Sequence, residues 1–225
     1  MYRHLRSSLA VVPSLSGDET WQPLQPQTLV DRVVEAIISQ AASGVILPGD
    51  RIVESDIGRK LGVSRVPVRE ALRLLESHGI VVNEPYKGIR LRPLTNLWVK
   101  DLVEARTSLE TSAAFRAVDV GHHQGSWIEP LQRAIAEMDL MAVRGDAYGL
   151  AAADTGFHRA LLRLGGNIVI LDLWETLARQ LTIVFGLATL GKPMQSIAEE
   201  HHDLLRVLMT GDKVAIAASL HEHIT

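Results

Sequence analysis

The sequence has 225 residues, of which 47% are hydrophobic and 22% charged, and its formal net charge is -3. These values predict a soluble globular protein with one large or two modest domains. Because there is no cysteine, disulfides, thiolate catalysis and sulfur-ligated zinc or iron–sulfur sites are excluded, and any metal ion would need nitrogen and oxygen ligands.

Residues 1–26 are rich in Ser, Pro and Gln without a sustained hydrophobic period, which predicts a flexible N-terminal tail. Its apolar run LAVV is too short for a signal peptide. No stretch of the chain approaches the roughly 18 apolar residues that a membrane span requires. We therefore expect a cytoplasmic protein that does not contact a membrane.

A helix is predicted to begin at Thr28, where Asp31 three residues later forms a capping box. Gly44 ends this helix, and the turn PGD at 48–50 leads into a short second helix that contains Ile57. The first helix is expected to bury one apolar face, made of Val30, Val33, Val34, Ile37, Ile38 and Ala41.

The stretch GVSRVPVREALRLLESHGI predicts the next helix, and with the helix before it a helix-turn-helix. Gly62 ends the preceding helix, Ser64 is a suitable N-cap, and Pro67 falls in the first turn, where a missing backbone donor costs little. The apolar residues follow helical spacing and form one buried stripe, made of Val68, Ala71, Leu72 and Leu75.

Three arginines lie four residues apart on another face of this helix, at Arg65, Arg69 and Arg73. A guanidinium group is a planar fork that suits phosphate oxygens and the acceptor edge of guanine. A solvated amphipathic helix would also carry arginines, but the neighbouring elements favour a helix that enters the major groove of DNA.

Two apolar runs, VV before the loop NEPYKG and IRL around its end, predict a β-hairpin. This hairpin would be a wing, with Lys87 and Gly88 at its tip and Arg90 and Arg92 on its outer face. The charge distribution agrees with a DNA-binding N-terminal part, since residues 27–95 hold ten Lys and Arg against eight Asp and Glu, and residues 96–225 hold eleven against sixteen.

From Leu97 onward the pattern is helical, with loop-like breaks at GHHQGS, RGD, GGN, GKP and TGD. About six antiparallel helices joined by short loops predict an all-α bundle. The expected fold is therefore mainly α, a winged helix-turn-helix followed by a helical bundle. The predicted helices are marked by apolar residues over 102–113 and 128–141 and then cover 147–164, 169–190, 196–209 and 214–224.

Four side chains of the bundle could bind a metal ion together: Asp154, His158, His201 and His223. Asp154 and His158 share a helix face, and the other two lie on later helices, so all four could converge in the core on zinc, nickel or manganese. Scattered histidines are more often surface or core residues, and this alternative stays open on spacing alone. The histidines expected not to be ligands are His122, His123, His202 and His221.

The run from GVILPGDRI through VSRVPVREALRLLESHGIV to YKGIRLRPL resembles the winged-helix DNA-binding domain of the GntR family of bacterial transcription regulators, here over residues 27–93. The resemblance implies base and phosphate contacts from the recognition helix and minor-groove contacts from the wing tip. At Ser55 some relatives have an arginine, so only a hydroxyl is available there for a phosphate. The predicted DNA-binding residues are Ser55, Ser64, Arg65, Arg69, Arg73, Lys87 and Gly88.

Residues 97–225 resemble the FCD effector-binding domain of the FadR-type branch of that family, through RTSLE at 106–110, GGN at 165–167 and the Asp/His pattern. The resemblance assigns the metal to Asp154, His158, His201 and His223 and implies small organic acids as effectors. Arg106 would hold the carboxylate of such an acid, unless it only forms a salt bridge with Glu110 one turn on.

We therefore expect a repressor-like transcriptional regulator, a homodimer on a palindromic operator, whose DNA binding responds to an organic acid at the metal site. The acid could release the DNA or strengthen its binding. Two alternatives remain: a regulator with a purely structural metal and a different switch, and a metal-dependent hydrolase.

Overall fold

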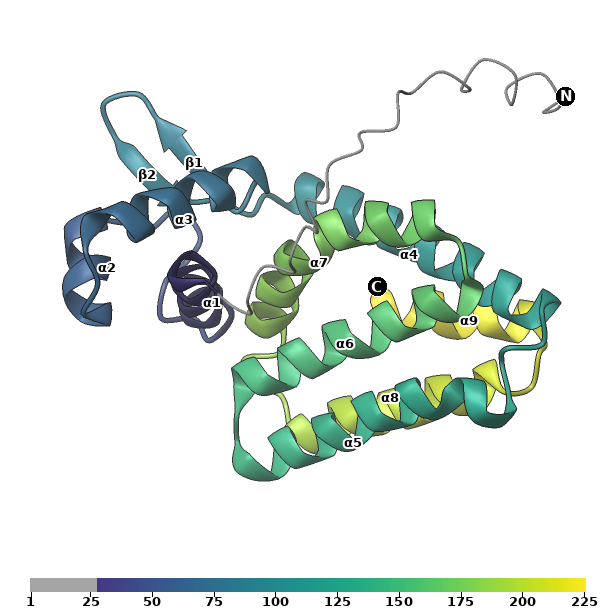
Figure 1. Cartoon of the computed structure of the whole chain (residues 1–225). Helices are drawn as coiled ribbons and strands as arrows, with labels where there is room; N and C mark the ends of the chain where they lie inside the picture. The colour runs from purple at the N-terminus through teal and green to yellow at the C-terminus, as the bar shows by residue number, and fades with distance from the viewer. Residues whose placement is uncertain (1–27) are drawn as a thin grey trace, which may run out of the picture.

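The computed structural model describes residues 28–225, and the predicted N-terminal tail over 1–26 lies outside this range. The described part holds nine α-helices, one short 3-10 helix (η1) and a two-stranded antiparallel hairpin (Figure 1). A winged helix-turn-helix, here called the head, precedes an all-helical bundle, so the expected fold class is confirmed. Within this part no helix has both the length and the apolar character required to cross a bilayer.

The head consists of three helices and the hairpin. The capping box is confirmed, because Thr28 Oγ1 accepts from the Asp31 amide at 3.2 Å and the Thr28 amide donates to Asp31 Oδ2 at 3.0 Å. Gly62 ends the second helix in a left-handed conformation with φ of 66°. The elements are α1 (Leu29–Ala42), α2 (Glu54–Leu61), α3 (Arg65–Ser77), β1 (Val81–Glu84) and β2 (Gly88–Leu91).

The core of the head forms where the apolar stripe of α3 meets α1. The four stripe residues predicted from the sequence are all buried, and Ile37 and Ile38 of α1 are in the same cluster. The hairpin closes this core, since Val81 pairs with Leu91 and both are buried. The opposite face of α3 therefore stays free for other contacts.

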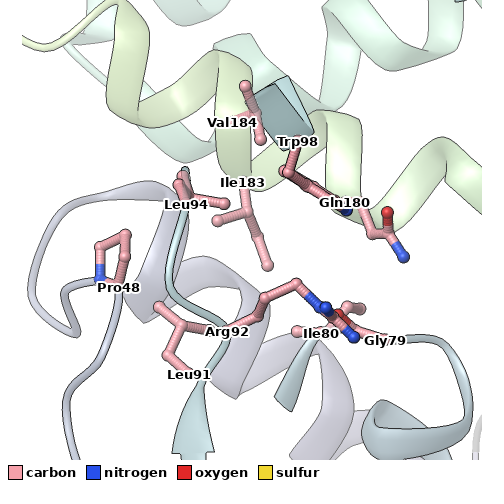
Figure 2. A pocket seen from close by; sticks show the side chains of 10 residues that line it. All are labelled: Pro48, Gly79, Ile80, Leu91, Arg92, Leu94, Trp98, Gln180, Ile183 and Val184. Carbon is pink, nitrogen blue, oxygen red and sulfur yellow. The ribbon is translucent and has the colours of Figure 1, made fainter. Parts of the chain in front are cut away.

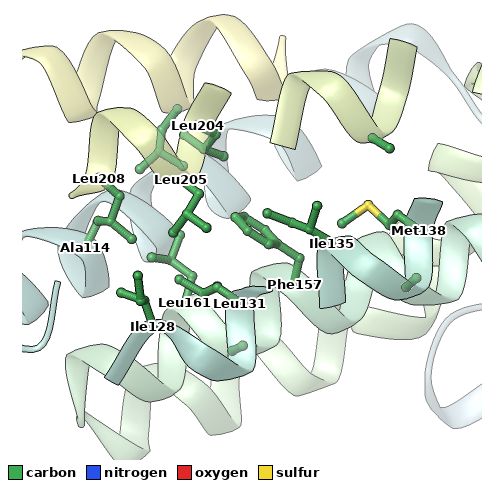
Figure 3. Packing of buried hydrophobic residues seen from close by; sticks show 14 of the residues in the cluster. Ala114, Ile128, Leu131, Ile135, Met138, Phe157, Leu161, Leu204, Leu205 and Leu208 are labelled. Carbon is green, nitrogen blue, oxygen red and sulfur yellow. The ribbon is translucent and has the colours of Figure 1, made fainter. Parts of the chain in front are cut away.

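Six helices form the C-terminal bundle, as the sequence predicted. Helices α5, α6, α8 and α9 and the C-terminal end of α4 pack around a core that includes Phe157, Leu131 and Leu205 (Figure 3). Phe157 is fully buried, and its ring lies next to those of His158 and His201. The elements are α4 (Asn96–Asp119), η1 (Gly125–Ile128), α5 (Glu129–Arg144), α6 (Ala147–Gly165), α7 (Ile168–Ala188), α8 (Met194–Leu208) and α9 (Lys213–Ile224).

Helix α7 belongs to both halves of the molecule and packs along α1 of the head (Figure 1). Its Trp174 is buried in the bundle, whereas its Ile183 is buried in the core of the head. Where the helices cross, Gly186 lies so near to α1 that a Cβ atom would be 2.5 Å from the Ala42 carbonyl oxygen. The absence of a side chain at Gly186 thus allows the two helices to meet.

We expect Gly186→Ala to lower the free energy of unfolding by about 1 to 3 kcal/mol, because the added methyl group must separate α7 from α1. Urea denaturation followed by circular dichroism measures this change. Gly156→Ala is the matched control: a Cβ at Gly156 of α6 meets nothing within 4 Å, so alanine should stabilise the helix by up to about 1 kcal/mol. Equal effects of the two substitutions would contradict the close packing of α7 on the head.

Candidate functional site

The arginine stripe of α3 faces away from the core of the head. Arg65, Arg69 and Arg73 are all exposed. Arg69 forms two hydrogen bonds with Glu54 of α2, at 3.3 and 3.2 Å, and Arg73 forms one with Glu70 at 2.8 Å. These ion pairs are exposed to solvent and therefore weak, so DNA phosphates can replace the carboxylates.

Two serines lie beside this stripe, and both are exposed. Ser64 occupies the N-cap position of α3, as predicted, but its side chain makes no capping hydrogen bond. Pro67 stands at the third helical position and has no backbone N–H, which explains part of this. The Ser64 hydroxyl thus remains available for another acceptor, and so does that of Ser55 on α2.

The wing tip carries the predicted Lys87 and Gly88 and one residue that the sequence reasoning missed. Tyr86 is fully exposed and has φ of 65°, an uncommon conformation for a residue with a side chain. Lys87 pairs with Glu84 at 3.0 Å. An aromatic ring held outward at a tip suits contact with a sugar or base edge. A Pro-Tyr pair in a turn was the available signal.

The prediction that Arg90 and Arg92 lie on the outer face of the wing is wrong. Both are half-buried: Arg90 Nη1 donates to the Gly49 carbonyl at 2.8 Å, and Arg92 Nε donates to the Gly79 carbonyl. The two carbonyl groups belong to the turn before α2, at Gly49, and the turn between α3 and β1, at Gly79. The two arginines therefore fasten the wing to the head.

The four predicted metal ligands come together in the bundle. Asp154 and His158 lie on α6, His201 on α8 and His223 on α9, and each offers a ligand atom within 4.8 Å of the others. The first three are at most 2% exposed. A buried carboxylate facing three imidazoles is the donor set of a divalent cation site.

Hydrogen bonds on the outer side of the cluster set the tautomers of two histidines. His158 Nδ1 lies 2.6 Å from Glu110 Oε2, and His201 Nδ1 lies 2.8 Å from the Ile197 carbonyl oxygen. Because these oxygens accept, both Nδ1 atoms donate, and in the neutral ring each Nε2 directs a lone pair inward. This arrangement is typical of metal-bound histidine.

Within residues 28–225, two of the inward atoms have no hydrogen-bond partner. Asp154 Oδ1 and His201 Nε2 are buried without a hydrogen-bond partner although they lie only 3.0 Å apart. His158 Nε2 and His223 Nε2 lie 3.2 Å apart. Facing acceptors repel each other unless a cation or a proton lies between them. The residues present therefore fit a divalent metal ion.

The protonation states agree with this donor set. Burial and the nearby His158 and His201 lower the pKa of His223 to about 2, so its imidazole is neutral. Although burial opposes ionisation of Asp154, His158 and His201 hold its pKa well below the usual range. Burial and Arg106 lower the pKa of His158, but Glu110 and Asp154 outweigh them and raise it. A proton and a metal ion thus compete for His158 Nε2.

Glu110 holds His158 in position from the side of the ring that faces away from the other cluster residues, a role that the sequence reasoning missed. It accepts from His158, from Arg106 Nε at 2.9 Å and from Trp174 Nε1 at 3.1 Å, and it is fully buried. Burial raises its pKa, but His158 and Arg106 outweigh burial and lower it to about 2. Its place one turn after Arg106 in RTSLE was the only signal.

Arg106 forms a salt bridge with Glu110, the alternative to carboxylate binding, and also lines a cavity of about 230 Å³. His223 lines the same cavity, so it borders the metal cluster. The bond to Glu110 uses Nε, which leaves the Nη side of the guanidinium for the cavity. Both roles considered for Arg106 are therefore compatible.

The four histidines expected not to be ligands lie outside the cluster. His202 is exposed and lies 3.3 Å from Asp139 Oδ2, and His221 is exposed at the end of α9. His122 bonds the Leu164 carbonyl oxygen at 3.0 Å, and its neighbour His123 lies in the same loop.

Known protein families match both halves of the chain. Residues 29–91 match the family described as "Bacterial regulatory proteins, gntR family", and residues 101–225 match the FCD domain. The chain is 31% identical to the "Probable D-xylose utilization operon transcriptional repressor" of Paenarthrobacter nicotinovorans, over 92% of this chain and 90% of that protein. It is 26% identical to the gluconate operon transcriptional repressor of Bacillus subtilis, over 85% and 80%.

Solved structures show the same fold. A crystal structure described as a GntR transcriptional regulator from Rhodococcus sp. RHA1 aligns with a TM-score of 0.69 at 24% identity, covering 87% of this chain and 93% of that one. E. coli McbR/YncC aligns with a TM-score of 0.69 at 21% identity, covering 88% and 94%. The chain belongs to the GntR family of bacterial regulatory proteins, as a DNA-binding transcriptional regulator with a C-terminal FCD domain.

Proposed function

We propose that this regulator is a repressor that binds a palindromic operator as a homodimer and responds to a small organic acid at a divalent metal site. The convergence of Asp154, His158, His201 and His223 beside a cavity carries the proposal. The names of two relatives, repressors of D-xylose and gluconate operons, support repression. The acid changes the relative arrangement of the two heads and thereby the affinity for DNA.

In this proposal the DNA contacts come from the exposed face of α3, the start of α2 and the wing tip. Arg65 and Arg69 read the major groove, and the wing tip with Tyr86 enters the minor groove. The DNA-binding domain covers 27–93 and the metal- and effector-binding domain 97–225. The proposed DNA contacts are Ser55, Ser64, Arg65, Arg69, Arg73, Tyr86, Lys87 and Gly88.

The proposed metal is zinc, with nickel or manganese as alternatives, because all ligand atoms are nitrogen or oxygen. When bound, the ion would offer open coordination positions to the carboxylate of the acid. Arg106 holds the same carboxylate from the cavity wall, and Glu110 keeps both Arg106 and His158 in position. The apolar ring of Phe157 packs against His158 and His201 in T-shaped contacts.

A purely structural metal is the second candidate, since three of the four ligands are almost completely buried. A hydrolase has no support, because both matched domains and the named relatives are those of transcriptional regulators.

Operator binding in the presence of acids separates the two candidates. We expect one member of a panel of small organic acids to change the operator affinity of the metal-loaded protein by about tenfold. Fluorescence anisotropy with a labelled operator fragment measures this change. The response should vanish after chelation and in Arg106→Gln. An acid response that persists in metal-free protein would exclude the metal from the switch, and a metal that binds without any acid response would favour the structural role.

A further inference from the structure

A cavity of about 470 Å³ lies between the head and the bundle. Its walls come from α1 and the end of α3 on the side of the head, and from α6 and α7 on the side of the bundle. Its volume is within the range of small-molecule sites, and many of its lining groups are polar or charged. The lining residues used below are Glu35, His78, Tyr148, Arg159, Glu175 and Arg179.

Most of the charged groups in this cavity already have partners. Arg159 forms two hydrogen bonds with Glu175, at 2.6 and 3.1 Å, and its charge is thereby neutralised. Tyr148 donates to Glu35 Oε2 at 2.6 Å, which leaves Glu35 Oε1 as an acceptor. These contacts form a polar wall that can accept hydrogen bonds from hydroxyl groups.

Arg179 is the exception. Its Nη1 donates to His78 Nδ1 at 2.9 Å, and within residues 28–225 no carboxylate oxygen lies within 4.0 Å of it. Burial and Arg179 lower the pKa of His78, so that the imidazole is neutral and does not balance the guanidinium charge. A half-buried arginine that faces a cavity without a carboxylate partner is a typical anion-binding group.

We propose that this interdomain cavity is a second small-molecule site, separate from the metal centre, for a hydroxylated anion. Arg179 holds the carboxylate or phosphate group of the ligand. Glu35 accepts hydrogen bonds from its hydroxyl groups, and His78 offers its Nε2–H. The site requires no metal ion and therefore does not depend on the proposed effector site.

The position of the cavity connects it with DNA binding. His78 is the C-cap of α3, and Gln180 of α7 donates to its carbonyl oxygen. The next residue, Gly79, has φ of 68° and lies between Arg92 and Gln180, where a Cβ would be 3.0 Å from Gln180 Nε2 (Figure 2). A ligand on Arg179 therefore lies directly against the fixed end of the recognition helix.

The cavity also shares a wall with the metal centre. On α6, Thr155 and Arg159 line the cavity, and each follows a metal-cluster residue, Asp154 or His158, in the sequence. The two sites are thus on adjacent faces of one helix. A ligand in the interdomain cavity would therefore favour one arrangement of the head relative to the bundle.

The test uses the full chain after chelation and removal of the chelator, titrated by calorimetry with inorganic phosphate and, separately, with glycerate. We expect at least one probe to bind, and the stronger probe identifies the anionic group. Arg179→Gln should weaken binding by about tenfold or more, because a charge-assisted contact is lost. Arg133→Gln, at an exposed arginine of α5, is the matched control and should change binding by less than about twofold.

A second variant keeps the test valid if Arg179→Gln disturbs the seam between the domains. Ala152→Leu fills the cavity from α6 without removing a polar group, and it should abolish binding while circular dichroism shows a folded protein. If neither probe binds the wild type, or if Ala152→Leu binds as the wild type does, the proposal is wrong.

Discussion

Arg65→Ala is expected to lose about 1 to 3 kcal/mol of specific operator binding, because the guanidinium fork at the start of α3 has no equivalent among neutral side chains. The effect of Arg69→Ala should be smaller, since wild-type Arg69 must first leave Glu54, with which it forms two hydrogen bonds. Fluorescence anisotropy on operator and on scrambled DNA at a fixed salt concentration measures both changes.

Arg163→Ala is the matched control for these variants. Arg163 is an exposed arginine on α6 of the bundle, so its loss removes the same charge far from the proposed groove contacts. We expect operator affinity to change by less than about 0.5 kcal/mol. Unchanged operator affinity in Arg65→Ala and Arg69→Ala, with α3 still folded, would contradict the assignment of α3 to the major groove.

The adjacent histidines of α8 provide the second test, since His201 is 1% exposed and His202 is exposed. His201→Ala removes a proposed ligand and with it the metal ion that would balance the charge of the buried Asp154 carboxylate. We expect the loss of bound metal and a decrease of about 3 kcal/mol in the free energy of unfolding. Elemental analysis of purified protein and urea denaturation with and without chelator measure the two effects.

His202→Ala should retain about one metal ion per chain and cost less than about 0.5 kcal/mol, because its exposed side chain bonds Asp139 at the surface. Chelation should destabilise the wild type and this variant equally and should not affect His201→Ala. Metal retention in His201→Ala, or equal metal loss in both variants, would exclude the proposed ligand set.

The sequence predicted the helices because they depend on regular spacing, whereas spacing alone left the four-residue cluster undecided. The apolar period of α3 and the turn residues between bundle helices are local signals. Asp154 and His158 are one turn apart and must share a face, but spacing does not bring His201 and His223, on two later helices, to the same point. The resemblance then selected these histidines among the nine of the chain.

Other parts of the site depend on tertiary contacts that leave no periodic signal. Arg90 and Arg92 alternate with apolar residues and looked solvent-exposed, but turns distant in sequence supply carbonyl acceptors for both. Glu110 and Trp174 are 64 positions apart and meet only in the folded bundle, where they share a hydrogen bond. A buried carboxylate of this kind cannot be distinguished from a surface one by spacing.

Because α7 contributes to the cores of both the head and the bundle, it restricts which heads and bundles can be joined in one chain. The head has an incomplete core by itself, because Ile183 from the FCD half fills part of it. A head joined to a foreign bundle would contain a vacancy at this position unless the new helix offered a side chain of similar volume and a glycine at the crossing with α1. An exchange of heads between two such proteins is therefore limited by the steric fit between α7 and the head, and not only by the length of the linker.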